Sequence, residues 1–95
     1  MAISPTDTIA ASPNVVAREV GDETVLLDLD EGTYFGLNPV GGSIWAFLES
    51  GSRPVSAICE MIVSEYDVEA DEAFEDVVAL VETLLANKLV SKEPG

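Results

Sequence analysis

The chain has 95 residues, enough for one domain with a single modest hydrophobic core. Hydrophobic residues make up 47% of it, so the net charge of -14 is expected on the surface of a folded protein rather than in a disordered chain. This charge argues against nucleic acid and anionic membranes as partners, because the basic residues that could contact phosphates are limited to Arg18, Arg53, Lys88 and Lys92.

Residue types that carry catalysis or bind metals are scarce. The sequence has no histidine, which excludes Ser-His and Cys-His pairs and the usual zinc sites, and its single cysteine, Cys59, excludes an internal disulfide. Cys59 falls within an apolar helical pattern with no Lys or Arg beside it, which predicts an inert thiol. We therefore expect no catalytic residue, no metal and no cofactor.

The N-terminal segment carries no recognisable targeting signal. It lacks the basic and long apolar regions of a secretory signal, and no window approaches the roughly 18 uninterrupted apolar residues of a membrane span. A cytoplasmic protein is expected. Residues 1–13 contain Pro5 and Pro13 and show no sustained period, which predicts a flexible arm.

Three short strands are predicted to follow and to form a small antiparallel meander. They cover residues 15–20, 24–30 and 33–37, and the turn residues Gly21 and Gly32 separate them.

The second predicted strand alternates with a period of two residues, which is typical of a half-buried strand. We expect its inner face to carry Val25, Leu27 and Leu29. Its outer face is then the acidic one, with Leu26, Asp28 and Asp30.

A helix is predicted directly after the third strand. Asn38 is a suitable N-cap, and Pro39 fits the first turn, where its missing N–H costs nothing, so we expect a helix over residues 39–49. Gly41 and Gly42 weaken its first turn and indicate that the helix backbone approaches a neighbour closely there.

Two more helices are predicted, at residues 54–65 and 70–87. The order of elements predicts an α+β fold, winged helix-turn-helix-like, in which a three-stranded antiparallel sheet is followed by three helices.

The apolar positions of the helix at 70–87 cover an arc of roughly 160°, wider than the stripe of about 100° that packing on one core requires. Either the core covers the whole arc, or one flank forms a wall of an apolar groove. The candidate flanks are Phe74 with Val78 and Ala73 with Leu80.

Several other functions fit the sequence poorly. The carboxylates of residues 60–82 lack the spacing and central glycine of an EF-hand and fall largely on the solvent side of the last helix. An acyl carrier protein needs an attachment serine at the start of a helix, and none lies in that setting. A winged helix DNA reader shares the element order but has the opposite charge.

The third predicted strand, at residues 33–37, lies at an edge if the strands pair in chain order. No proline or lysine protects this edge, so an extended peptide can add to it as a further strand. We expect the wide arc of the last helix to supply apolar pockets for the side chains of such a peptide.

The sequence between residues 25 and 45 resembles the PqqD-like family of small peptide-binding domains, also called RiPP recognition elements. Its most specific part is the pattern Gly-x-Tyr-Phe-x-Leu-Asn-x-x-Gly-x-x-Ile-Trp, which begins at Gly32. Weaker matches at residues 55–58, 76–84 and 89–90 extend the resemblance over about residues 15–90. The free-standing leader-binding proteins of lasso peptide biosynthesis are the members that it is most similar to.

The resemblance implies a protein without enzymatic activity that binds the leader segment of a ribosomally made precursor peptide and presents it to a separate maturation enzyme, a leader peptidase. In the family, the leader lies between the third strand and the third helix. Residues 14–91 would form the leader-binding domain and residues 92–95 a C-terminal tail. The family usually has Gly after the last helix, where this chain has Lys88. The implied peptide-binding residues are Thr33, Tyr34, Phe35, Gly36, Leu37, Phe74, Asp76, Val77 and Leu80.

Two other functions remain possible on the sequence. One is a carrier or chaperone in the biosynthesis of a PQQ-type cofactor, working with a radical SAM enzyme. The other is a scaffold that binds its enzyme but no leader.

Overall fold

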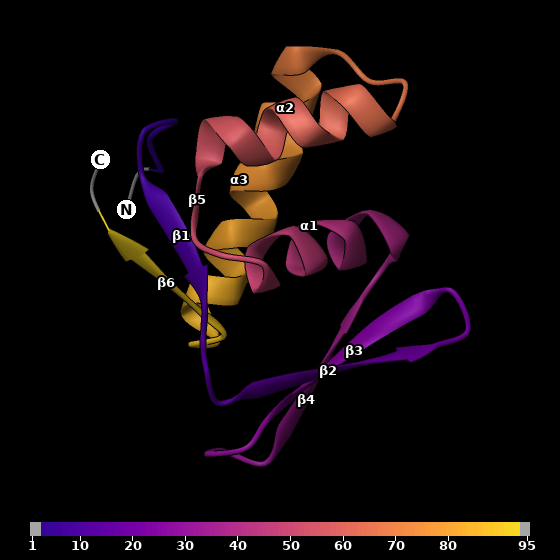
Figure 1. Cartoon of the computed structure of the whole chain (residues 1–95), viewed down its shortest axis with the longest axis vertical. Helices are drawn as coiled ribbons and strands as arrows, with labels where there is room; N and C mark the ends of the chain where they lie inside the picture. Colours follow the sequence, from indigo (N-terminus) through magenta and orange to yellow (C-terminus); the bar gives the residue numbers. More distant parts are fainter. Residues whose placement is uncertain (1–2, 94–95) are drawn as a thin grey trace.

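The structure is a computed structural model that describes residues 3–93. It confirms the α+β class, with three helices and two three-stranded antiparallel sheets among the described residues (Figure 1). In chain order the elements are β1 (Thr8–Ala11), β2 (Val15–Val20), β3 (Glu23–Asp28), β4 (Thr33–Leu37), α1 (Pro39–Glu49), β5 (Arg53–Pro54), α2 (Val55–Glu65), α3 (Ala70–Ala86) and β6 (Val90–Glu93).

The predicted meander is the sheet formed by β2, β3 and β4, in that order. Its register pairs Ala17 with Leu26 and Leu26 with Phe35, so these three side chains share one face. The first and third strands have the predicted bounds, whereas the second runs from Glu23 to Asp28. In Figure 1 this sheet lies below α1, away from the other two helices.

The predicted orientation of β3 is wrong. Leu26 and Asp28 point to the core, with 0% and 5% of their surface exposed, whereas Leu29 is 61% exposed. The Asp28 carboxylate tolerates burial because its Oδ1 accepts hydrogen bonds from the backbone N–H groups of Asp30 and Glu31, at 2.9 and 3.2 Å, in the turn to β4.

Helix α1 begins and ends where the sequence predicts. The Asn38 side chain accepts a hydrogen bond from the N–H of Gly41 at 2.8 Å, as an N-cap should. The predicted close approach is confirmed at Gly42, since a Cβ on this residue would lie 2.5 Å from Oγ1 of Thr24 in β3. Glycine therefore lets the helix start pack directly on the sheet.

The N-terminal segment is part of the fold, contrary to the flexible arm predicted for residues 1–13. Strand β1 lies at the centre of the second sheet, between β5 and β6, and Ile9 is completely buried. The first N–H groups of α2 donate to the carbonyl oxygens of Asp7 and Pro5, at 2.9 and 3.0 Å. These long-range bonds, which a local sequence pattern does not reveal, hold the segment in place. Residues 1–2 lie outside the described part of the chain.

The C-terminal end is likewise structured further than predicted. Residues 92 and 93, expected in a tail, belong to β6, and Lys92 forms an ion pair with the largely buried Asp7 at 3.6 Å. Residues 94–95 of the predicted tail lie outside the described residues.

Lys88, just after helix α3, has a left-handed backbone conformation, and it occupies the position where the family usually has Gly. Lys88 has φ 60°, and the N–H of Leu89 donates to the carbonyl of Leu84 while that of Lys88 donates to Leu85. This is a Schellman motif formed with lysine in place of glycine. It turns the chain back so that β6 runs antiparallel to β1.

The core lies between the three helices and the inner faces of both sheets. Its largest completely buried side chains come from both sheets and from all three helices. They are Trp45, Ile9, Leu26, Ile58, Leu84, Val55, Val77 and Val81. No helix in residues 3–93 is long and apolar enough to cross a membrane.

Replacing Asp28 with alanine tests the corrected orientation of β3. Asp28→Ala leaves two N–H groups of the turn without their acceptor, so we expect the free energy of unfolding to fall by about 1–3 kcal/mol in urea denaturation. The exposed neighbour Glu31 is the control, and Glu31→Ala should change stability by less than about 0.5 kcal/mol. Equal effects of the two variants would contradict the buried, hydrogen-bonded position of Asp28.

Candidate functional site

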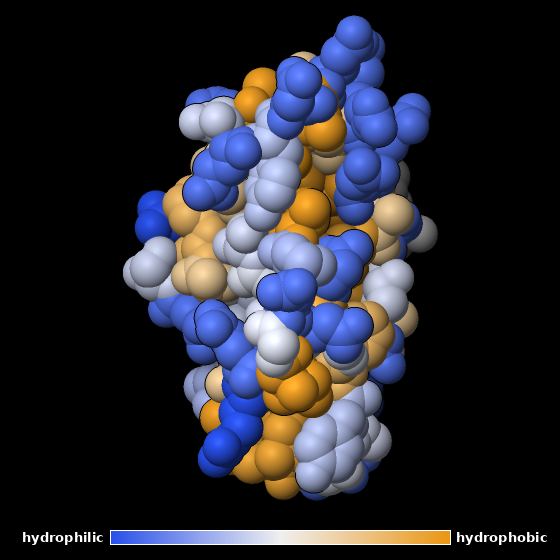
Figure 2. Space-filling view, turned by 90° about the vertical axis from the view of Figure 1, so that its right-hand side faces the viewer, coloured by the Kyte–Doolittle hydropathy of each residue, from blue (hydrophilic) through white to orange (hydrophobic). Residues whose placement is uncertain are grey.

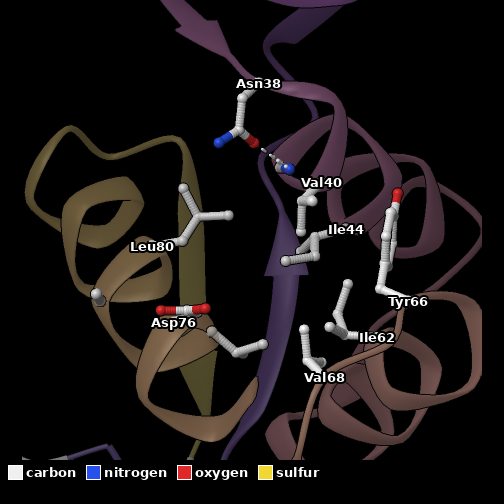
Figure 3. Close-up of a pocket in the computed structure, with 11 residues that line it drawn as sticks. Asn38, Val40, Ile44, Ile62, Tyr66, Val68, Asp76 and Leu80 are labelled. Atoms are coloured by element: carbon white, nitrogen blue, oxygen red, sulfur yellow. Dashed lines mark hydrogen bonds between the residues drawn. The ribbon is translucent and has the colours of Figure 1, made fainter. Parts of the chain in front are cut away.

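An apolar cavity of about 420 Å³ opens where β4 ends and α1 begins. Helix α1 contributes Val40 and Ile44, which face Leu80 and Asp76 of α3 across the space (Figure 3). Ile62 at the end of α2 and Val68 in the following loop line the side opposite Asn38. The cavity has the size of a small-ligand or side-chain pocket, and most of its lining is aliphatic.

Polar groups of the chain hold the walls of the cavity in place. The Asn38 amide lies at its edge and is fixed by the hydrogen bond to Gly41. On the other side, the Tyr66 hydroxyl and the Ser43 hydroxyl are 2.8 Å apart and share a hydrogen bond that ties the α2–α3 loop to α1. The loop is further constrained by the Val68 N–H, which donates to the Tyr66 carbonyl at 2.9 Å. These hydrogen bonds connect the walls of the cavity to one another within the chain.

The two flanks of α3 are not equivalent. Asp76, Val77, Ala79 and Leu80 line the cavity, so the open flank is the one that carries Leu80. Phe74, which the resemblance places in the site, is half-buried against the core and is not among the lining residues. The wide apolar arc of α3 is thus covered by the core on one flank and faces the cavity on the other.

Strand β4 leads directly to the cavity and forms one edge of its sheet. It pairs with β3 alone, so along its other side the backbone groups of alternate residues point away from the sheet. Phe35 and Leu37 face the core, while Tyr34 is 74% exposed. A Cβ added at Gly36 would meet no atom within 4 Å. The residues from Thr33 to Leu37 lie beside the cavity rather than in its lining.

Several lining residues were not predicted as site residues. Asn38, Val40 and Ile44 carried signals for a helix cap and a core face, which their positions also satisfy. Tyr66 and Val68 lie in a loop, where periodicity gives no information. The complete set that the sequence did not assign to the site is Asn38, Val40, Gly41, Ile44, Ile62, Tyr66, Val68 and Ala79.

The cavity offers shape and apolar contact but no catalytic pair. Asp76 is its one ionisable carboxylate. Within residues 3–93, His, Cys, Asp and Glu side chains form no group of three or more that could hold a metal ion. Cys59 lies on α2 outside the cavity lining, and burial, with the neighbouring Glu60 as a smaller cause, raises the pKa of its thiol.

The family model for coenzyme PQQ synthesis protein D (PqqD) matches residues 23–90, which is most of the chain. The chain belongs to the PqqD family. The match begins with β3 and ends at the first residue of β6, so it includes β4 and every residue that lines the cavity. No curated protein matches the chain.

Two solved structures resemble this PqqD-family chain closely. One is TbiB1 in complex with the TbiA(beta) leader peptide, 36% identical, with a TM-score of 0.79 over 86% of this chain and 94% of that one. The other is a lasso peptide synthetase B1 complexed with the leader peptide, 29% identical, with a TM-score of 0.75 over 87% of this chain and 96% of that one. The similarity extends over almost the full length of both relatives.

The raised pKa of Cys59 predicts slow chemical modification. Because the thiolate is the reactive form, a raised pKa leaves less of it at neutral pH, and labelling by a disulfide reagent should be slower than in the urea-unfolded protein. The difference should shrink as the pH rises through the pKa of the folded thiol. Equally fast labelling of folded and unfolded protein at pH 7 would contradict an inert cysteine.

Proposed function

We propose that this chain binds the leader segment of a ribosomally synthesised precursor peptide as an added β-strand along β4. The observation that carries the proposal is the continuity of two features, the free edge of β4 and the apolar cavity that opens where this strand ends. A peptide paired with β4 continues past Asn38 and meets Leu80, Val40 and Ile44. Backbone pairing and side-chain insertion can therefore act on one extended segment.

Backbone pairing alone is too weak for useful affinity. Four or five new hydrogen bonds at a net ~1 kcal/mol each fall short of the ~8 kcal/mol that a micromolar complex needs, before any ordering cost. Burying one or two aliphatic or aromatic side chains adds about 1.5–3 kcal/mol each. The cavity supplies such burial next to the strand, and the hydrogen bonds that tie its walls together limit the ordering cost.

The comparisons support a leader peptide as the extended segment. Both solved relatives were determined in complex with a leader peptide, and their similarity covers 86% and 87% of this chain. We extend this ligand class to the present chain. Asp76 at the rim of the cavity favours a leader with a basic residue near the inserted side chain.

A binding role without catalysis agrees with the composition of the site. The cavity has a single carboxylate and no nucleophile paired with a base, so the reaction on the precursor belongs to a separate maturation enzyme, which we propose to be a leader peptidase. The protein would hold the leader and present the rest of the precursor to that enzyme.

Titration of this protein into its fluorescently labelled leader, followed by anisotropy, tests the proposal. It should show a dissociation constant below about 1 mM.

Paired substitutions on the two flanks of α3 test where the leader lies. Leu80→Ala removes apolar surface from the cavity wall and should weaken leader binding by roughly tenfold, since about 1–2 kcal/mol of burial is lost. Val78 is also half-buried but lies outside the cavity lining, so Val78→Ala should leave affinity within about twofold of the parent protein.

Thermal unfolding of both α3 variants separates loss of binding from loss of folding. Both replaced side chains are half-buried, so the two melting temperatures should fall by similar small amounts. If Val78→Ala weakens binding as much as Leu80→Ala, or more, the leader does not use the cavity flank.

A further inference from the structure

A second apolar surface lies on the outer face of the β2–β3–β4 sheet. We define the outer face by the residues that surround a shallow hollow of about 410 Å³ on this sheet, namely Val16, Arg18, Val20, Val25, Leu27, Leu29 and Tyr34. Figure 2 shows apolar side chains gathered at the lower end of the molecule, at the height of this sheet in Figure 1. No helix covers this end of the molecule in Figure 1.

The outer face is a concentrated patch rather than a scatter of exposed side chains. Of the five large hydrophobic residues that residues 3–93 leave exposed, four belong to it, with exposed fractions between 42% and 74%. The register explains the hollow, because the cross-strand row Arg18, Val25 and Gly36 ends on a residue without a side chain. Contiguous apolar patches of this kind on a small protein mark interaction sites.

Charge indicates what covers the patch. Arg18 pairs with Val25 and has Val16 and Val20 two residues away on the same face of its strand. The one ion pair among residues 3–93 joins Lys92 to Asp7, so Arg18 is in none. Glu23 shares this face but lies at its far end, opposite Val20. A lone cation inside an apolar patch fits a partner with an apolar surface and a carboxylate, and Arg and Tyr are the residue types enriched at interface centres.

A second copy of this chain is a poor occupant. Each copy carries a net charge of -14, so stacking two outer faces would bring two strongly acidic molecules together. The outer face is also continuous with the proposed leader site, because Tyr34 belongs both to the outer face and to the free strand β4. A protein that docks on the outer face would lie next to a leader strand added to β4.

We infer that the outer face is the docking surface for the separate enzyme that acts on the bound precursor, and that this enzyme presents an apolar surface with a carboxylate opposite Arg18. The inference rests on the proposed function, since it takes the enzyme's substrate to be the peptide held at β4. It assigns leader binding and enzyme binding to two adjacent surfaces of one small sheet.

The test measures leader affinity and enzyme action separately in the same variants. Arg18→Glu and Leu29→Glu alter the outer face, and Val63→Glu is the matched control, because Val63 is the fifth exposed hydrophobic residue and lies on α2 outside the patch. The probes are the labelled leader and the purified peptidase acting on the full-length precursor. All variants should bind the leader within about twofold of the parent protein, which also shows that they are folded.

Cleavage of the precursor at limiting amounts of this protein should fall by roughly tenfold or more in Arg18→Glu and Leu29→Glu and stay unchanged in Val63→Glu. Parent-like cleavage in both outer-face variants would overturn the inference. A second result would also overturn it. If sedimentation shows that the parent protein is a dimer, and Leu29→Glu separates the dimer without slowing cleavage, the outer face binds a second copy of this chain rather than the enzyme. Absence of leader binding in the parent protein would instead refute the proposed function itself.

Discussion

Leu26 and Asp28 point into the molecule from β3, and the positions of the other side chains on the β2–β3–β4 sheet follow from this orientation. In a strand, a shift by one residue moves every side chain to the opposite face. With Leu26 inside, its cross-strand partners Ala17 and Phe35 also face the core. The alternate residues of the three strands are then left on the outer face. Leu37, two residues after Phe35, also points to the core, and the next residue, Asn38, caps α1 at the edge of the cavity.

The same sheet provides two kinds of surface at right angles to each other. Along the free edge of β4, backbone groups can pair with an extended peptide, and the cavity beyond Asn38 adds apolar burial. On the outer face, aliphatic side chains and Tyr34 surround a hollow beside Arg18 and offer apolar contact without a backbone edge. A protein of this size can therefore offer one surface to a peptide and another to a second protein, because the cavity beside β4 is lined by the helices whereas the outer face lies on the strands alone.

Local signals in the sequence were enough to predict β4, the cap at Asn38 and the bounds of α1. They led to the wrong orientation of β3, because both of its faces carry leucine. The observed orientation places the Asp28 carboxylate where it accepts hydrogen bonds from the N–H groups of Asp30 and Glu31 in the following turn. Strands β1 and β6 were missed since their pairing is long-range. The cavity flank of α3 could not be chosen from periodicity, and Tyr66 and Val68 join the site only because a loop folds against α1.

Amide hydrogen exchange with and without the cognate leader tests the central claim most directly. The account predicts slower exchange at the amides of β4 and of α3 near Leu80 when the leader is bound, with β2 at the other edge of the sheet unchanged. Tight binding of the leader with protection at β2 or β6, and none at β4, would contradict strand addition at this edge.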